Sequence, residues 1–253
     1  VTLTYHANGG NGADINESYP NNTLVTLKGA DTFTRTGYTL TGWNTESDGT
    51  GTFFAAGANA RVDNIDSNDL YAIWTINEYA YTIEYYIDGV KNDSLTVRDK
   101  ADYNTEISTY PDKCPSGYVL DKTENLPLTI GTNESANVIK VYYKKNIFTL
   151  TIHYVYAEGG TAVGDYSAQV TFGAPYSVTS PAIDGYTVDK ATVSGTMPAN
   201  DVVETVTYTK RSNPTYYVTY SWNGTTEKDA ESKTVNEKTF NASATNSPAN
   251  VDC

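Results

Sequence analysis

The chain has 253 residues and a formal net charge of -13, and its lysines and arginines do not cluster along the sequence. An acidic chain of this kind is repelled by nucleic acid and by anionic membrane surfaces, so we expect neither as a partner. No apolar run approaches the roughly 18 residues that a membrane-spanning helix needs, so we expect no membrane insertion in this segment.

Tyrosine is unusually common, at 22 residues, while the chain has one methionine and two cysteines. Tyr and Thr favour strands, and Asn, Asp and Gly favour tight turns, so this mixture predicts a mainly β protein with many short strands. Two cysteines cannot supply a disulfide framework. The scarcity of cysteine and methionine is typical of an exported protein.

One alternating pattern occurs four times along the chain, beginning at Val1, Tyr81, Phe148 and Tyr216. In each copy the first, third and fifth residues are apolar or aromatic, and the residues between them are mostly polar. Such alternation predicts a strand with one face on a core and one face in water. The fourfold recurrence predicts a row of small domains rather than one large domain.

A glycine–tyrosine pair opens a second strand in each of the first three copies. The pairs are Gly37-Tyr38, Gly117-Tyr118 and Gly185-Tyr186. We expect each glycine to occupy a turn, and the three tyrosines to be equivalent residues that are buried or half-buried. No stretch has a convincing helical period, and residues 58–62 could form one turn of helix at most.

Short polar connectors separate the copies. We predict three complete domains at residues 1–76, 80–145 and 147–211, and an incomplete fourth at residues 214–253. These segments are called the first, second, third and fourth repeats below. Because the connectors are only a few residues long, we expect neighbouring repeats to lie end to end with modest freedom to swing.

The first repeat carries a Tyr-His-Ala-Asn-Gly-Gly turn, an Arg-Thr-Gly-Tyr stretch that runs to Gly-Trp-Asn, two further glycine turns and a closing aromatic strand. These motifs occupy residues 5–10, 35–44, 48–52, 56–57 and 70–74. In them, residues 1–75 resemble the internalin B-type repeat, also called the Listeria–Bacteroides repeat.

The third repeat carries a different set of motifs, at residues 166–176, 183–186, 195–198 and 206–208. In these it resembles the mucin-binding-protein (MucBP) repeat. The second repeat looks similar, but it departs at residues 127–132, where the third repeat has Gly-Thr-Met-Pro.

Both families are similar to small ubiquitin-like β-grasp domains. They occur in tandem on surface proteins of mainly Gram-positive bacteria, between an adhesive or enzymatic head and a cell-wall anchor. The resemblance therefore implies a mainly β chain of tandem β-grasp-like repeats that is exported and attached to the cell surface or cell wall. It transfers no catalytic residue, cofactor or metal site.

The residues themselves support few sharper readings. His6 and His153 occupy the same outward position of equivalent strands, without a nucleophile or metal-ligand spacing, so we expect surface strand residues. The acidic run Asp63, Asp66 and Asp69 lacks a patterned calcium loop and is better read as a solvated turn. Isopeptide crosslinking needs an inward lysine, and we find no candidate because Lys140 points outward.

Four tyrosines occupy outward strand positions, namely Tyr71, Tyr86, Tyr142 and Tyr217. They could stack on sugars or form cross-strand pairs. Cys114 and Cys253 occupy equivalent positions of the second and fourth repeats, so we expect them to lie too far apart to pair.

The resulting hypothesis is a monomeric, non-enzymatic stalk or spacer segment of a bacterial surface protein, with a role in adhesion left open. The alternative is a set of modules that bind host glycans or mucin directly. The sequence assigns no ligand-binding residue.

Overall fold

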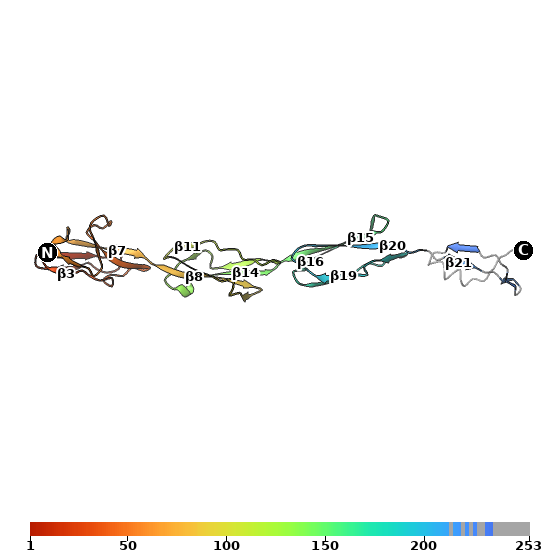
Figure 1. The fold of residues 1–253 in the computed structure, drawn as a ribbon, viewed down its shortest axis with the longest axis horizontal. Coiled ribbons are helices and arrows are strands. Elements are labelled where there is room, and N and C mark those ends of the chain that lie inside the picture. Colours follow the sequence, from red (N-terminus) through yellow and green to blue (C-terminus); the bar gives the residue numbers. More distant parts are fainter. Residues whose placement is uncertain (213–214, 219–220, 223–224, 227–230, 235–253) are drawn as a thin grey trace. The chain divides into compact units, whose positions relative to one another are not determined.

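The computed structural model of the chain is almost wholly β (Figure 1). It describes residues 1–212, 215–218, 221–222, 225–226 and 231–234. The chain divides into two compact units, Val1–Pro115 with Val119–Lys144, and Ser116–Tyr118 with the residues from Lys145 onward.

The first repeat is built on a mixed sheet with the strand order β2-β1-β7-β4-β5. Its strands are β1 (Thr2–His6), β2 (Ile15–Ser18), β4 (Tyr38–Asn44), β5 (Phe53–Ala55) and β7 (Asp69–Ile76). A separate antiparallel pair, β3 (Leu24–Thr26) and β6 (Asn59–Arg61), contributes one buried residue from each strand to the same core.

Strand β6 occupies most of residues 58–62, the stretch that could form one turn of helix at most. Asn59–Arg61 is extended because its backbone pairs with β3, and this pairing buries Ala60. Only Val62–Asn64, directly after the strand, forms a one-turn 3-10 segment, η1.

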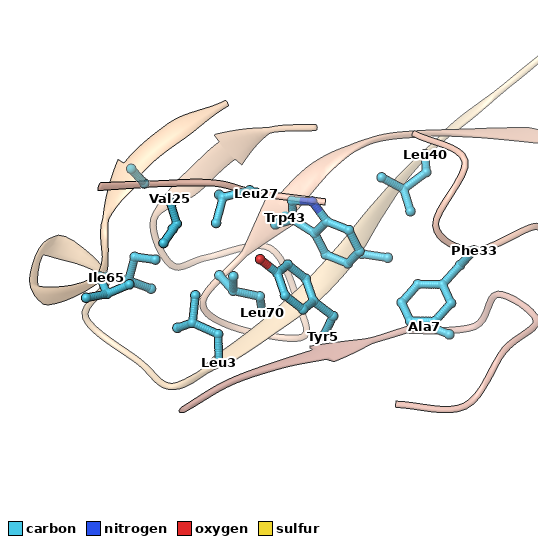
Figure 2. Close-up of a cluster of buried hydrophobic side chains, with 13 residues drawn as sticks. Leu3, Tyr5, Ala7, Val25, Leu27, Phe33, Leu40, Trp43, Ile65 and Leu70 are labelled. Carbon is cyan, nitrogen blue, oxygen red and sulfur yellow. The ribbon is translucent and has the colours of Figure 1, made fainter. Parts of the chain in front are cut away.

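The core of the first repeat lies between the sheet and this small strand pair. Tyr5 and Trp43 are fully buried and meet edge to face, with ring centroids 4.8 Å apart. Figure 2 shows them packed among aliphatic side chains from β1, β7 and the loops. The indole Nε1 donates a hydrogen bond to the carbonyl oxygen of Lys28 at 2.8 Å, which satisfies the one polar atom that this large side chain buries.

The second repeat has the sheet order β10-β8-β14-β12, with β9 paired to β8 and a separate β11-β13 pair. Its elements are β8 (Glu78–Ile87), β9 (Val90–Lys91), β10 (Val97–Asp102), β11 (Glu106–Ile107), β12 (Tyr118–Glu124), β13 (Leu128–Thr129), the 3-10 turn η2 (Glu134–Ala136) and β14 (Val138–Lys145).

The third repeat has the sheet order β16-β15-β20-β18 and a separate β17-β19 pair. Its strands are β15 (Ile147–Tyr156), β16 (Thr161–Thr171), β17 (Pro175–Thr179), β18 (Tyr186–Val188), β19 (Thr192–Thr196) and β20 (Val202–Lys210).

In all three sheets the first strand lies beside the last strand and runs parallel to it: β1 with β7, β8 with β14, and β15 with β20. The predicted alternation of the first strands is confirmed, because the third and fifth residues of the pattern are buried in each of the three repeats. They are Leu3 and Tyr5, Ile83 and Tyr85, and Leu150 and Ile152.

The three glycines of the Gly-Tyr pairs adopt positive φ angles of 78°, 83° and 80°, as predicted for turn positions. The tyrosines that follow are half-buried. Their surroundings differ from our expectation, however. Tyr186 packs against the core of its own repeat, whereas Tyr38 lies outside the core cluster of the first repeat and contacts Tyr103 of the second.

Of the fourth repeat, the structure describes the backbone of β21 (Thr215–Val218), which pairs with β24 (Glu231–Thr234), and of β22 (Ser221–Trp222), which pairs with β23 (Thr225–Thr226). The side chain of Tyr217 and the whole of Cys253 lie outside the described residues.

Candidate functional site

The outward tyrosines of the second repeat form a cross-strand pair. Tyr86 on β8 lies opposite Tyr142 on β14, and their rings stack with centroids 4.6 Å apart and an interplanar angle of 21°. The Tyr86 hydroxyl donates to Glu84 at 2.8 Å, and the Tyr142 hydroxyl donates to Glu124 at 3.0 Å. The Lys122 ammonium lies 4.6 Å from the centroid of the Tyr142 ring.

Charge reinforces this arrangement. Lys91 Nζ lies 2.7 Å from Glu84 Oε1, and this hydrogen bond holds the pKa of Glu84 below its usual range. Hydrogen bonding to the Glu84 carboxylate, with burial as a smaller cause, raises the pKa of Tyr86. The hydroxyls and one face of each ring are therefore already occupied, as expected of a strand surface stabilised by cross-strand pairs.

Tyr71 on β7 corresponds to Tyr142 of the second repeat. It stacks on His6 of the neighbouring strand β1, with ring centroids 4.7 Å apart. The two imidazole nitrogens of His6 meet carboxylates on both sides, Asp14 at 3.0 Å and Asp69 at 2.9 Å. In the third repeat the Nδ1 atom of His153 lies 2.8 Å from Asp165. Both histidines lie on the outward face as predicted, and each is held by carboxylate partners.

The acidic run Asp63, Asp66 and Asp69, which ends at the first residue of β7, does not converge on one point. Asp66 accepts a hydrogen bond from Thr52, Asp69 turns to His6, and Asp63 is exposed. Calcium needs several oxygens at one centre. Within the part of the chain that the structure describes, no group of three or more His, Cys, Asp or Glu residues could hold a metal ion.

Two concave surfaces of the first unit are shallow and polar. One is lined by six residues around the junction of the first and second repeats: Ile76, Asn77, Glu78, Tyr79, Lys100 and Asp102. Another lies beside the turn of residues 9–11 and the segment of residues 34–36. Neither has the apolar lining that small-molecule sites usually have.

Comparison with known families identifies two parts of the chain. The family model of the Listeria-Bacteroides repeat domain matches residues 2–73, and that of the MucBP domain matches residues 149–245. The chain contains a Listeria-Bacteroides repeat and a MucBP domain. Both are non-enzymatic repeat domains that occur in surface proteins. The two matches confirm the resemblances inferred for the first and third repeats, whereas neither match covers the second repeat.

Two curated relatives come from Evansella cellulosilytica. One is described as a candidate Gly-rich membrane protein and is 28% identical over 163 residues, which are 62% of this chain and 18% of the relative. The other is described as a candidate membrane protein and is 31% identical over 125 residues, which are 49% of this chain and 18% of the relative. The matched region thus spans less than a fifth of either relative.

Solved structures with detectable likeness include the type 2 repeat of the mucus binding protein MUB from Lactobacillus reuteri. It is 22% identical and covers 53% of this chain and 100% of its own, with a TM-score of 0.24. The Bacillus anthracis TIE protein is 14% identical and covers 83% of this chain and 49% of its own, with a TM-score of 0.41.

Among the residues that the structure describes, no helix has the length and apolarity required to cross a membrane.

Two aromatic residues were not recognised from the sequence. Tyr103 and Phe172 each stand at the end of an edge strand and directly before a residue with positive φ, Asn104 or Gly173. An aromatic residue followed by Asn or Gly, 22 residues after Tyr81 in the second repeat and 24 residues after Phe148 in the third, was the available signal.

Proposed function

We propose that this chain is a non-catalytic stalk segment of a bacterial cell-surface protein, built from tandem β-grasp-like repeats that follow one another end to end. The parallel pairing of first and last strands, flanked by antiparallel neighbours, supports the β-grasp assignment. The same pairing recurs in each repeat with its own buried residues.

The observation that carries the stalk role is the length of the connectors between repeats. One residue, Asn77, separates β7 from β8, and one residue, Asn146, separates β14 from β15. A one-residue connector between two strands has far less freedom than a flexible linker, whose end-to-end distance fluctuates with its length. Such connectors suit a segment that keeps a head domain away from the cell surface.

The proposal that the chain is not an enzyme rests on the contacts that its histidines make and on the form of its surface hollows. His6 and His153 are engaged by carboxylates on the strand surface, and the two hollows described above are shallow and polar. A catalytic site needs an acid, base or nucleophile that converges on a substrate.

Direct mucus binding is the second candidate, and the MucBP match at residues 149–245 favours it. A binding assay separates the two. The 253-residue chain is passed over immobilised mucin and over a glycan array, with the MUB type 2 repeat as the reference protein. The stalk proposal predicts no retention above that of an unrelated acidic β protein, whereas saturable retention would favour the binding function.

A replacement experiment tests the stalk role itself. In the cell-surface protein that carries this segment, residues 1–211 are exchanged for unrelated tandem β domains of equal length. Adhesion or activity of the full protein should survive the exchange and fall when the segment is deleted. Loss of function after the equal-length exchange would overturn the proposal. Accessibility of the segment to protease on intact cells checks the extracellular location.

A further inference from the structure

The Gly-Tyr turn of the first repeat meets an aromatic residue of the second repeat. Gly37 is buried, and the ring of Tyr103 lies so close to it that a Cβ atom at this position would come within 2.1 Å of the ring. Real Cβ atoms essentially never approach other heavy atoms to less than 3.0 Å. The turn therefore needs glycine twice, for its φ of +78° and for the space that the Tyr103 ring fills.

Two further tyrosines surround this contact. Tyr38 and Tyr79 each meet the Tyr103 ring edge to face, with centroids 6.3 Å away in both cases. The guanidinium of Arg35 lies 4.0 Å from the centroid of the Tyr38 ring. Edge-to-face aromatic pairs and a guanidinium over an aromatic ring are both favourable geometries.

The connector residue holds the backbones of the two repeats together. The Asn77 N–H donates to the Gly37 carbonyl at 2.9 Å, and the Asn77 carbonyl accepts from the Tyr103 N–H at 2.9 Å. The backbone of Asn77 is thus hydrogen-bonded to both the first and the second repeat. We call Gly37, Tyr38, Asn77, Tyr79 and Tyr103 the glycine–aromatic joint.

The second unit contains the same arrangement at the equivalent positions. The Phe172 ring lies over Gly117, where a Cβ atom would come within 2.7 Å of it, and it meets Tyr118 edge to face at 5.7 Å. The Asn146 N–H donates to the Gly117 carbonyl, and the Asn146 carbonyl accepts from the Phe172 N–H, both at 2.9 Å. The glycine–ring contact, one edge-to-face pair and both backbone hydrogen bonds recur around a different aromatic residue, which argues against chance packing.

The Gly-Tyr turn of the third repeat makes the first of these two backbone hydrogen bonds, because the Arg211 N–H donates to the Gly185 carbonyl at 2.8 Å. In the sequence, Thr239-Phe240-Asn241 repeats the aromatic-then-Asn signal of Tyr103 and Asn104, but those three residues lie outside the described residues.

We infer that the Gly-Tyr turn is a docking surface for the following repeat, and that the aromatic residue at the end of that repeat's edge strand couples the two domains. The docked group is a Tyr or Phe ring that packs against a glycine. The backbone N–H of the same aromatic residue donates a hydrogen bond to the carbonyl of the connector residue. The inference does not rest on the stalk function, since a binding protein could use the same joint.

A double-mutant cycle on the full chain tests this, with Gly57 as the matched control. Gly57 has φ +74°, close to that of Gly37, but a Cβ atom there would meet nothing within 4 Å among the described residues. Both Gly→Ala substitutions introduce the same backbone strain, so the additional loss in Gly37→Ala reports the contact with Tyr103. Trp222→Phe is included throughout, so that fluorescence reports on Trp43 and Trp74 of the first repeat.

Gly37→Ala is expected to lower the denaturation midpoint of the first repeat clearly more than Gly57→Ala does. In a Tyr103→Ala background the two substitutions should have equal effects, because the ring that clashes is gone. An extra loss that persists without the ring would overturn the inference, and so would equal effects in the presence of Tyr103.

Hydrogen exchange of the full chain provides a second measurement that a misfolded variant cannot imitate. Loss of two edge-to-face pairs in Tyr103→Ala predicts roughly tenfold faster exchange of the peptides that contain Asn77 and Tyr103. Peptides from β1 should keep their protection, which shows that the first repeat remains folded. Tyr103→Phe should restore slow exchange, because Phe172 already fills this role in the second unit. Unchanged exchange in Tyr103→Ala would overturn the coupling.

Discussion

Strand β15 offers a matched test of whether each small core determines the stability of its own repeat. Ile152 is fully buried, whereas Ile147 on the same strand is 55% exposed. Both Ile→Ala substitutions remove three carbon atoms and the same β-branch. At about 0.8 kcal/mol per buried methylene, the transfer cost of Ile152→Ala is about 2.4 kcal/mol, and the cavity raises the expected total toward about 4 kcal/mol. Ile147→Ala should stay within about 0.5 kcal/mol of the wild type.

The size of the repeat makes the buried substitution severe. A core in a domain below about 70–80 residues rarely supplies more than about 3–5 kcal/mol, so Ile152→Ala should remove most of the stability of the third repeat. Hydrogen exchange with peptide resolution measures this on the full chain. Peptides from residues 147–210 should lose protection, while those from residues 1–76 keep it. Equal effects of the two substitutions, or loss of protection in the first repeat, would refute the reasoning.

Three further predictions concern the second repeat. Tyr143→Phe removes the hydrogen bond of 2.6 Å that lowers the pKa of Asp112. Because this pKa is lowered in the folded state, the bond stabilises the fold above the ordinary Asp pKa, and that stabilisation is lost on acidification. Thermal melts of variant and wild type should therefore differ most near neutral pH and converge as the pH falls through the lowered pKa of Asp112. Asn137→Ala leaves the N–H and carbonyl of Gly131 without their amide partner, and denaturant titration should show a loss of about 2 kcal/mol; no change would mean that water replaces the amide. Burial raises the pKa of the Cys114 thiol, so alkylation near pH 8 should be slower in the native chain than in urea, and equal rates would contradict the burial.

The fold follows from the sequence to the extent that it depends on local alternation. Leu150 and Ile152 alternate with polar residues, and a period of two places them on one face wherever the strand is placed. The mainly β character was predictable for the same reason, because strand and turn residues recur along the chain. The two repeat families were predictable only because the motifs of the first and third repeats resemble those of known families. The strand at β6 was missed because Asn59–Arg61 is extended only through its pairing with distant β3.

The outward tyrosines show where sequence reasoning must leave an alternative open. Tyr86 and Tyr142 are 56 residues apart, and only the parallel register of β8 and β14 places them opposite one another. Before that register is known, an outward tyrosine is equally compatible with a sugar-stacking surface. In the structure these two rings form a stacked cross-strand pair, and Glu84 and Glu124 accept hydrogen bonds from their hydroxyls.

The Gly-Tyr pair was the most conspicuous feature of the sequence, but its partner could not be inferred from the pair itself. A glycine before a strand is explained by a positive φ alone, and that explanation suffices at positions such as Gly57. What distinguishes Gly37 is a ring 66 residues later in the sequence, reached only because Asn77 joins the two backbones. A motif that recurs once per repeat can therefore serve the contact between repeats rather than the core within one, and the equivalent contact of Gly117 with Phe172 follows the same rule.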